Sequence, residues 1–240
     1  MKNALVTGGA GGIGAAVCRE LASMGLRVGI HCHSSREQAQ ALSVELNGIN
    51  GQDNPVLCAD LCSRGETEAM FAAFGDVDLL VNNAGVAQQK LFTDITAADW
   101  EHMMAVDVTA VFHCCQLALP HMIRQKEGCI VNISSMWGQV GASCEVHYSA
   151  AKAAVIGMTK ALAKEVGPSG VRVNCVSPGV IATKMNGNLS DGDLLALKEE
   201  TPLERLGTPE DVARAVGYLA GPGGTFITGQ ILAINGGFVI

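Results

Sequence analysis

The amino-acid sequence predicts a doubly wound α/β domain, in which a seven-stranded parallel sheet carries helices on both faces. Short apolar runs alternate with segments whose apolar residues recur at helical spacing, and this alternation predicts parallel strands joined by right-handed crossovers. The predicted strands span residues 4–7, 27–32, 55–59, 77–82, 129–134, 171–177 and 230–234. The predicted helices include residues 13–24, 36–46, 100–125, 148–166 and 209–220. In such a sheet, ligands bind beyond the carboxyl ends of the strands.

A single domain accounts for the whole chain. A length of 240 residues fits one layered core, and no internal repeat, low-complexity tract or linker divides residues 1–240. The irregular stretch spans residues 179–208, where Asn, Gly, Asp and Pro interrupt the pattern. We expect that stretch to be a mobile substrate lid.

Composition and charge argue against several classes of protein. With 48% hydrophobic and 16% charged residues, the chain is too apolar to be disordered, and it has no uninterrupted apolar run long enough to span a bilayer. Its first apolar stretch is too short for a secretory signal, so we expect a cytoplasmic protein without a membrane partner. The net charge of −7 argues against nucleic acid as a partner. The nine cysteines lack zinc-binding spacing, so we expect buried, reduced thiols and no metal.

A glycine-rich loop follows the first predicted strand and opens the first predicted helix, which is the context of a Rossmann-type dinucleotide site. Glycines allow a tight turn and a close approach of the backbone to a pyrophosphate, whose charge the free N–H groups of the helix N-terminus stabilise. The loop alone would also fit a strand-to-helix turn without a ligand. The predicted cofactor residues here are Gly8, Gly11, Gly12, Ile13 and Gly14.

The end of the second predicted strand favours NADP(H) over NAD(H). An acidic residue at this place binds the ribose hydroxyls of NAD and repels a 2′-phosphate, but no carboxylate appears before Glu37. His33, Ser34 and Arg36 are predicted to surround the phosphate, although the same residues also suit a solvated turn and helix start.

The chain resembles the short-chain dehydrogenase/reductase family over essentially all of its length. The motifs that carry the resemblance are the loop at Thr7, Asp60, Asn82-Asn83-Ala84-Gly85, Ser135, Tyr148-x-x-x-Lys152, Pro178-Gly179 and Asn235-Gly236-Gly237. The resemblance implies that Lys152 also holds the nicotinamide ribose, that Ser135 hydrogen-bonds the substrate oxygen, and that a reduced nicotinamide supplies hydride. The further cofactor contacts it implies are Asp60, Leu61, Asn83, Ala84, Gly85, Tyr148, Lys152, Pro178, Gly179, Ile181 and Thr183.

The Tyr148–Lys152 pair also has a physical reading of its own. A spacing of four residues places both side chains on one helix face, one turn apart. We expect the ammonium of Lys152 to favour the phenolate, which would move the Tyr148 pKa from about 10 toward the operating pH. Tyr148 would then protonate the new alkoxide.

Two positions on the substrate side depart from the family pattern, as does the glycine loop. Asp107 stands where the family usually has Asn, and a carboxylate about 4 Å from a cation is worth roughly 4 kcal/mol at an effective dielectric constant of about 20, so Asp107 could hold Lys152 or raise the Tyr148 pKa. We include Asp107 among the catalytic candidates and expect an active enzyme. Members that use NADP often have a basic residue where this chain has Gly11, so the 33–36 turn must recognise the phosphate. Glu145 replaces a common Gln beside the substrate.

Two narrower resemblances give two candidate substrates. The first resemblance is to the 3-oxoacyl-[acyl-carrier-protein] reductases, through residues 170–178, 226–229 and 235–237. It implies acyl carrier protein as a partner. The other is to the elongation factor P 5-aminopentanone reductases, through residues 87–92, 134–138, 141–146 and 199–203. Glu145 would stabilise an ammonium-bearing substrate, and Trp137 is the second candidate substrate residue, although Glu145 could instead face water and Trp137 pack in the core.

A function from another class also fits, because Asp107 could mark an NADP-binding regulatory protein that has lost turnover. The intact Ser135, Tyr148 and Lys152 argue against it. Family members are commonly homotetramers, and the apolar C-terminal residues 238–240 suggest burial at such an interface.

Overall fold

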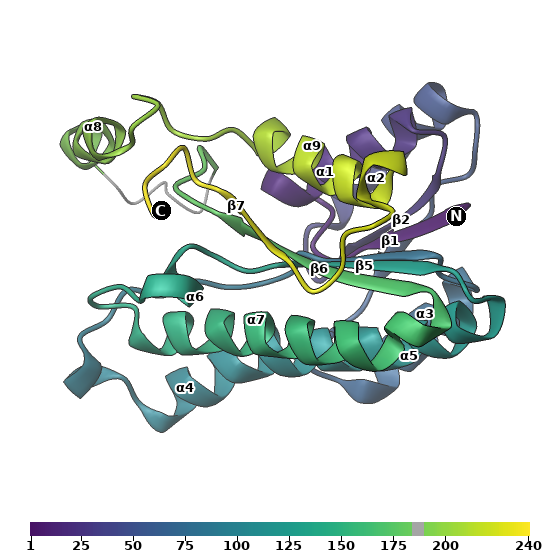
Figure 1. Ribbon diagram of the computed structural model, residues 1–240, viewed down its shortest axis with the longest axis horizontal. Helices are drawn as coiled ribbons and strands as arrows, with labels where there is room; N and C mark the ends of the chain where they lie inside the picture. Colours follow the sequence, from purple (N-terminus) through teal and green to yellow (C-terminus); the bar gives the residue numbers. More distant parts are fainter. Residues whose placement is uncertain (184–189) are drawn as a thin grey trace.

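The computed structural model describes residues 1–183 and 190–240 and has the predicted fold (Figure 1). One seven-stranded sheet runs in the order β3-β2-β1-β4-β5-β6-β7, and every neighbouring pair is parallel. Its strands are β1 (Asn3–Val6), β2 (Arg27–Cys32), β3 (Val56–Cys58), β4 (Leu79–Asn82), β5 (Gly128–Ile133), β6 (Val171–Pro178) and β7 (Ile231–Ile234). The order changes direction beside β1, so a crevice for a ligand is expected at the carboxyl ends of β1 and β4.

Helices cover both faces of the sheet (Figure 1). α1 (Gly12–Ser23), α2 (Arg36–Asn50) and α9 (Pro209–Ala220) enclose one apolar core, and α3 (Arg64–Phe74), α5 (Ala110–Gln125) and α7 (Val146–Val166) enclose the other. The other helices in the described residues are α4 (Ala97–Met104), α6 (Trp137–Val140) and α8 (Asp191–Glu200), with the short turns η1 (Phe92–Asp94), η3 (Gly167–Ser169) and η5 (Pro222–Gly224). Within β4, Leu79 and Leu80 are fully buried in opposite cores, because successive strand residues face opposite sides. Each such leucine contributes about 1.5–3 kcal/mol of burial.

The predicted helix 100–125 is one continuous helical segment that contains a π-helical turn. It begins at α4 with a capping box between Thr96 and Asp99, passes through η2 (Ala105–Thr109), and continues as α5. The extra residue of the π turn lies where Asp107 is fully buried. Residues 97–125 are long and apolar enough to cross a membrane by length and composition, with a mean hydropathy of 1.4 and 39% of the window buried. The core helix of a globular domain can have the same length and composition, and Cys114 and Met122 of this segment pack in one of the two apolar cores.

The sequence did not predict α3 or α8. α3 begins after Ser63, whose side chain accepts a hydrogen bond from Glu66 N, and buries Met70, Phe71 and Phe74. α8 lies inside the predicted lid, which is therefore partly helical. Ile181 forms an isolated bridge with Gly207, and residues 184–189 of the predicted lid lie outside the described residues.

The amino ends of the strands are held together by Asp78. Its carboxylate accepts hydrogen bonds from Lys2 N at 2.6 Å and Asn3 N at 3.0 Å, and from the Gln125 amide at 2.9 Å. His121 Nε2 lies 3.0 Å from the same carboxylate. Burial opposes ionisation, but the hydrogen bonds from these partners together hold the pKa of the Asp78 carboxyl well below its usual value.

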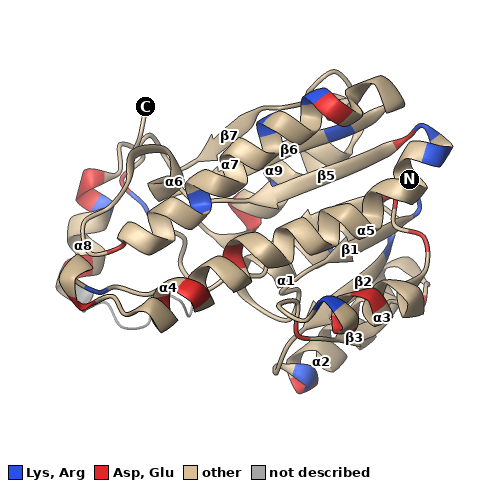
Figure 2. Ribbon diagram, turned by 90° about the horizontal axis from the view of Figure 1, so that it is seen from below, with Lys and Arg blue, Asp and Glu red and all other residues tan. Residues whose placement is uncertain are grey.

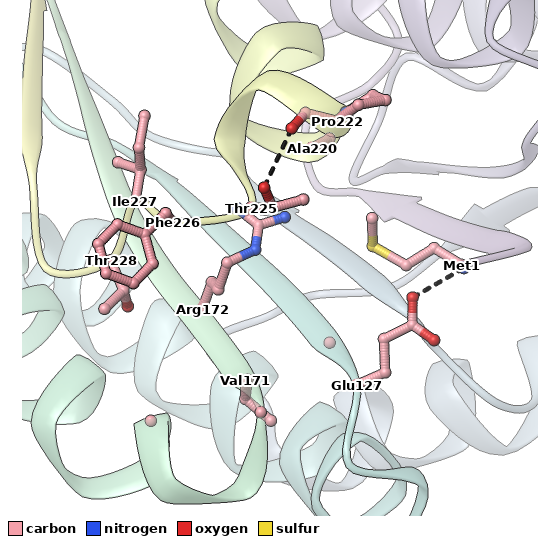
Figure 3. Close-up of a pocket in the computed structure, with 14 residues that line it drawn as sticks. Met1, Glu127, Val171, Arg172, Ala220, Pro222, Thr225, Phe226, Ile227 and Thr228 are labelled. Carbon is pink, nitrogen blue, oxygen red and sulfur yellow. Dashed lines mark hydrogen bonds and ion pairs between the residues drawn. The ribbon is translucent and has the colours of Figure 1, made fainter.

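A cavity of about 740 Å³ lies beside this end of the sheet (Figure 3). Its lining includes Arg172 of β6, Pro222 and the fully exposed Phe226. Met1 closes one side through an ion pair of its amino group with Glu127 at 3.4 Å. The cavity is at the end of the sheet opposite the glycine loop, where a doubly wound fold does not place its dinucleotide site.

We predict that Asp78→Ala lowers the free energy of unfolding by about 2–3 kcal/mol at pH 7, because the partly buried N–H groups of Lys2 and Asn3 lose their acceptor. Since the folded pKa is depressed, the contribution is complete above the unfolded pKa of about 3.9 and is lost as the pH falls below it. Urea unfolding at pH 7 and at about pH 3.5 measures both effects. The exposed Asp53→Ala is the matched control, and equal stability of the two variants at pH 7 would contradict this role.

Candidate active site

The glycine loop forms a cradle that fits the pyrophosphate of a dinucleotide. Gly8 and Gly12 have φ angles of +62° and +54°, which side chains other than glycine rarely adopt. A Cβ atom on Gly8 would lie 2.9 Å from Ala84 Cα, whereas a Cβ atom on Gly11 would meet nothing within 4 Å. α1 starts at Gly12 without a side-chain cap, so its first N–H groups remain available to an anion. Ile13 and Gly14 lie in this first turn.

Two side chains fix the cradle to the end of β4. Thr7 Oγ1 accepts the N–H groups of Asn83 and Ala84 at 2.9 and 3.0 Å. Asn83 Nδ2 donates to the carbonyls of Thr7 and Gly8 at 3.0 and 3.1 Å. The predicted run 83–85 therefore borders the loop directly.

His31 is a functional candidate that the sequence reasoning missed. Its Nε2 lies 3.0 Å from Ala59 O and must donate, so Nδ1 is left to accept the N–H of Gly8 at 3.0 Å. Burial lowers the His31 pKa below its ordinary value, which favours this neutral form. The available signal was a polar residue in an otherwise apolar strand, next to the glycine loop.

The predicted phosphate-binding residues lie together at the end of β2. His33, Ser34 and Arg36 are exposed, and Arg36 is the first residue of α2. Across from them, Asp60 follows β3 and its Oδ1 accepts the N–H of Cys62 at 2.9 Å, while Leu61 is buried. These residues border the side of the cradle where β2 and β3 end.

Lys152 and Asp107 form a buried ion pair at the centre of the site. Lys152 Nζ lies 2.8 Å from Asp107 Oδ2, and the two residues are 5% and 0% exposed. The other oxygen, Oδ1, accepts the N–H of Val86 at 2.8 Å. Gly85 leaves room for the pair, because a Cβ atom there would lie 3.0 Å from Asp107 Oδ2 and 3.1 Å from Lys152 Nζ.

Tyr148 and Ser135 lie beside this pair. α7 begins at Val146, so Tyr148 is in its first turn, and Lys152 Nζ lies 5.6 Å from the centroid of the Tyr148 ring. Ser135 Oγ accepts the N–H of Trp137 at 3.2 Å. Ser134 Oγ donates to Lys152 O at 2.8 Å and so fixes α7 to the end of β5. The structure thus brings the four predicted catalytic residues together.

The expected lowering of the Tyr148 pKa is wrong. Burial raises the Tyr148 pKa most, Lys152 and a hydrogen bond with Ser135 lower it, and the charges of Asp107 and Glu145 raise it again, so the net shift is upward. Burial lowers the Lys152 pKa, but the charge of Asp107 and then Tyr148 outweigh it, so the Lys152 pKa is also raised. Asp107 offsets the ammonium that was expected to favour the phenolate.

The two substrate candidates both precede Tyr148 in the chain and have different surroundings. Glu145 is partly exposed at the start of α7, and its Oε1 accepts a hydrogen bond from Gln89 at 3.1 Å. Trp137 is partly buried and packs edge-on against Phe238 with ring centroids 5.8 Å apart. Glu145 is therefore partly exposed to water and also bound to Gln89. Trp137 connects α6 with the C-terminal segment through Phe238.

The segment after β6 reaches back to the glycine loop. Pro178 ends β6, and the Gly179 N–H donates to Ile234 O at 2.9 Å. Ile181 is buried. The side chain of Thr183 would lie 3.6 Å from a Cβ atom on Gly12, so this predicted cofactor contact adjoins the cradle.

A doubly wound sheet with a glycine cradle and a Tyr-Lys pair at the carboxyl ends of its strands defines a dinucleotide-binding oxidoreductase. A family model described as short chain dehydrogenase matches residues 2–194. The chain therefore belongs to the short-chain dehydrogenase family, and it is an oxidoreductase that acts on CH–OH and C=O groups.

Relatives match the chain along nearly its full length. The 3-oxoacyl-[acyl-carrier-protein] reductase FabG of Staphylococcus aureus is 38% identical over 240 residues, which cover 98% of this chain and 97% of the relative. The uncharacterized oxidoreductase YmfI of Bacillus subtilis is 37% identical, with coverages of 99% and 98%. A crystal structure of a protein proposed to be a gluconate dehydrogenase, from Agrobacterium tumefaciens, superposes with a TM-score of 0.95 at 30% identity, with coverages of 100% and 97%.

We predict that Asp107→Asn lowers the Tyr148 pKa, because it removes a negative charge that opposes the phenolate. Alcohol oxidation, which needs the phenolate, should then begin to rise at a pH roughly one unit lower than in the unmodified protein. The pH profile of kcat/KM measures this shift, and the exposed Asp94→Asn is the matched control. A profile that stays in place or moves to higher pH would contradict the electrostatic role of Asp107.

Proposed function

We propose that this protein reduces a ketone to a secondary alcohol with NADPH. The observation that carries the proposal is the convergence of Tyr148, Ser135 and the buried Lys152–Asp107 pair beside the glycine cradle. The exposed residues at the end of β2, with no carboxylate before Glu37, support NADP(H) over NAD(H). Bound NADPH would supply the hydride.

The chain's own residues would handle the proton. Because burial and the nearby carboxylates raise its pKa, Tyr148 is protonated at neutral pH and is suited to donate its proton to the developing alkoxide. The Ser135 hydroxyl would hydrogen-bond the same oxygen and orient it. Lys152 would stay an ammonium, since Asp107 favours its charged form, and would hold the ribose while limiting the cost of a phenolate after the transfer.

A 3-oxoacyl thioester on acyl carrier protein is the first substrate we propose. The relative from Staphylococcus aureus bears that activity in its name and matches along nearly the whole chain. A ketone that carries an amine, such as the 5-aminopentanone modification of elongation factor P, is the second candidate. Glu145 supports it, because its carboxylate is partly exposed and close enough to Tyr148 to raise that residue's pKa.

We also propose a homotetramer in the cytoplasm. Few charged residues colour the ribbon of α5 in Figure 2. Trp100, Phe112 and Ile123 on the segment 97–125 are 42%, 48% and 41% exposed, and Ile240 at the C-terminus is fully exposed. Burial of these apolar side chains against other copies would remove them from water. The molar mass of the protein in solution tests this assembly.

We expect Tyr148→Phe to reduce the rate of NADPH oxidation with an acetoacetyl thioester or a reactive diketone by about 10²–10⁴-fold, because the general acid is lost. NADPH should still bind, as followed by its fluorescence. The matched control is Tyr218→Phe, which changes the chain's other tyrosine, half-exposed on α9. NADPH binding by the unmodified protein without turnover of any ketone would favour a regulatory protein instead.

The two substrate classes predict different effects of Glu145→Gln on KM. If the substrate carries an ammonium, its KM should rise roughly tenfold while the KM for an acetoacetyl thioester changes less than about twofold. A higher efficiency with the thioester alone would favour the acyl carrier substrate. Deletion of the gene supplies a second readout, in which the masses of elongation factor P and of the cellular fatty acids are measured by mass spectrometry. A normal mass of elongation factor P would exclude the amine-bearing substrate.

A further inference from the structure

Two cysteine thiols lie in contact at the ends of β2 and β3. Cys32 and Cys58 are register partners on these neighbouring parallel strands, and their sulfur atoms are 3.4 Å apart. β2 and β3 lie side by side at the edge of the sheet (Figure 2). Strands in a sheet are about 4.8 Å apart, and a disulfide requires Cα atoms roughly 4.4–6.8 Å apart, so rotation of the two side chains can bring the sulfurs to bonding distance.

The two thiols differ in exposure. Cys58 is exposed, whereas Cys32 is 2% exposed. Burial, and then the hydrogen bond with Cys58, raises the Cys32 pKa to about 11, so Cys32 stays protonated while Cys58 meets solvent first. An accessible thiol next to a second, resolving thiol is the arrangement of redox-responsive cysteine pairs.

The pair is adjacent to the residues that we propose for cofactor binding. Cys32 directly precedes His33, and the backbone after Cys58 is tied to β2, because Ala59 N donates to Cys32 O at 3.3 Å. His31, which precedes Cys32, joins Ala59 to the N–H of Gly8 in the glycine cradle. A covalent link at this point would constrain the start of the 33–36 turn.

We propose that Cys32 and Cys58 are a reversible oxidation site at which a hydroperoxide forms a disulfide that weakens binding of the 2′-phosphorylated dinucleotide. The cofactor part rests on the proposed NADPH dependence, and the disulfide itself does not. The expected consequence is selective, because the linked residues adjoin the turn predicted to hold the 2′-phosphate rather than the pyrophosphate cradle.

The chemistry balances with hydrogen peroxide as the oxidant. The sulfur of Cys58, as its thiolate, attacks one peroxide oxygen, the O–O bond breaks, and a sulfenic acid and hydroxide form. The sulfur of Cys32 then attacks the Cys58 sulfur, and the sulfenic hydroxyl leaves as water with the Cys32 proton. Overall, two thiols lose two protons and two electrons, and the peroxide becomes two molecules of water.

The first experiment detects the bond. After treatment of the full chain with hydrogen peroxide, we expect the mass of the protein to fall by about 2 Da and digestion to yield a peptide that links Cys32 to Cys58, both reversed by dithiothreitol. Cys58→Ser should prevent the link, and the matched Cys62→Ser, a partly exposed thiol nearby, should not. Absence of the linked peptide, or sulfinic acid at Cys58 in its place, would overturn the proposal. Reversal by dithiothreitol separates this effect from oxidation of the nine methionines, which it does not reduce.

The second experiment measures the consequence for the cofactor. In the disulfide form we expect the Kd for NADPH to rise roughly fivefold or more and the Kd for NADH to change less than about twofold. Peroxide-treated Cys58→Ser should keep the NADPH affinity of the untreated protein. A disulfide that leaves both affinities unchanged would overturn the regulatory part. If the untreated protein prefers NADH, the proposed cofactor fails while the mass measurement still decides on the disulfide.

Discussion

The buried ion pair between Asp107 and Lys152 is the interaction on which the chemical end of the site depends. Asp107 and Lys152 are 0% and 5% exposed, so either charge alone would be costly to bury, and each stabilises the charged form of the other. The pair joins three segments, because Asp107 also accepts the N–H of Val86 and Lys152 belongs to α7. Tyr148 lies one turn before Lys152 on α7. Its pKa therefore depends on both charges of the pair and not on the ammonium alone.

The short run from Asn83 to Val86 couples this pair to the dinucleotide end. At one end of the run, Asn83 and Ala84 are bound to Thr7 and the glycine loop. At the other end, Val86 is bound to Asp107. Between them, Gly85 leaves room for both charged side chains. Four residues therefore set the distance between the cradle and the proton donor, and a shift of this run would move both.

Sequence periodicity predicted the seven parallel strands, and the spacing of four residues predicted that Tyr148 and Lys152 lie together. The resemblance to the family added Ser135 and Asp107, which the structure places beside this pair. Other features depend on tertiary contacts and were not predictable in this way. The direction of the Tyr148 pKa shift depends on how much burial opposes Lys152. The role of His31 depends on its contact with the glycine loop, which follows a different strand. The first turn of α3 is polar, so the helical spacing of its buried residues is not apparent from the start of the segment.

The single π turn makes the helix 97–125 a segment with two phases. An α-helix advances by about 100° per residue, so one extra residue rotates everything before it relative to everything after it. α5 is held on the sheet, whereas α4 presents Asp99 to Lys90 and Gln88, which donate hydrogen bonds to its carboxylate. Removal of one residue between 105 and 109 would turn Asp99 away from those partners while leaving the core beneath α5 in place. The spacing of this helix is thus a constraint on length as well as on residue type, because one residue fewer would change the direction of Asp99 even if every side chain were kept.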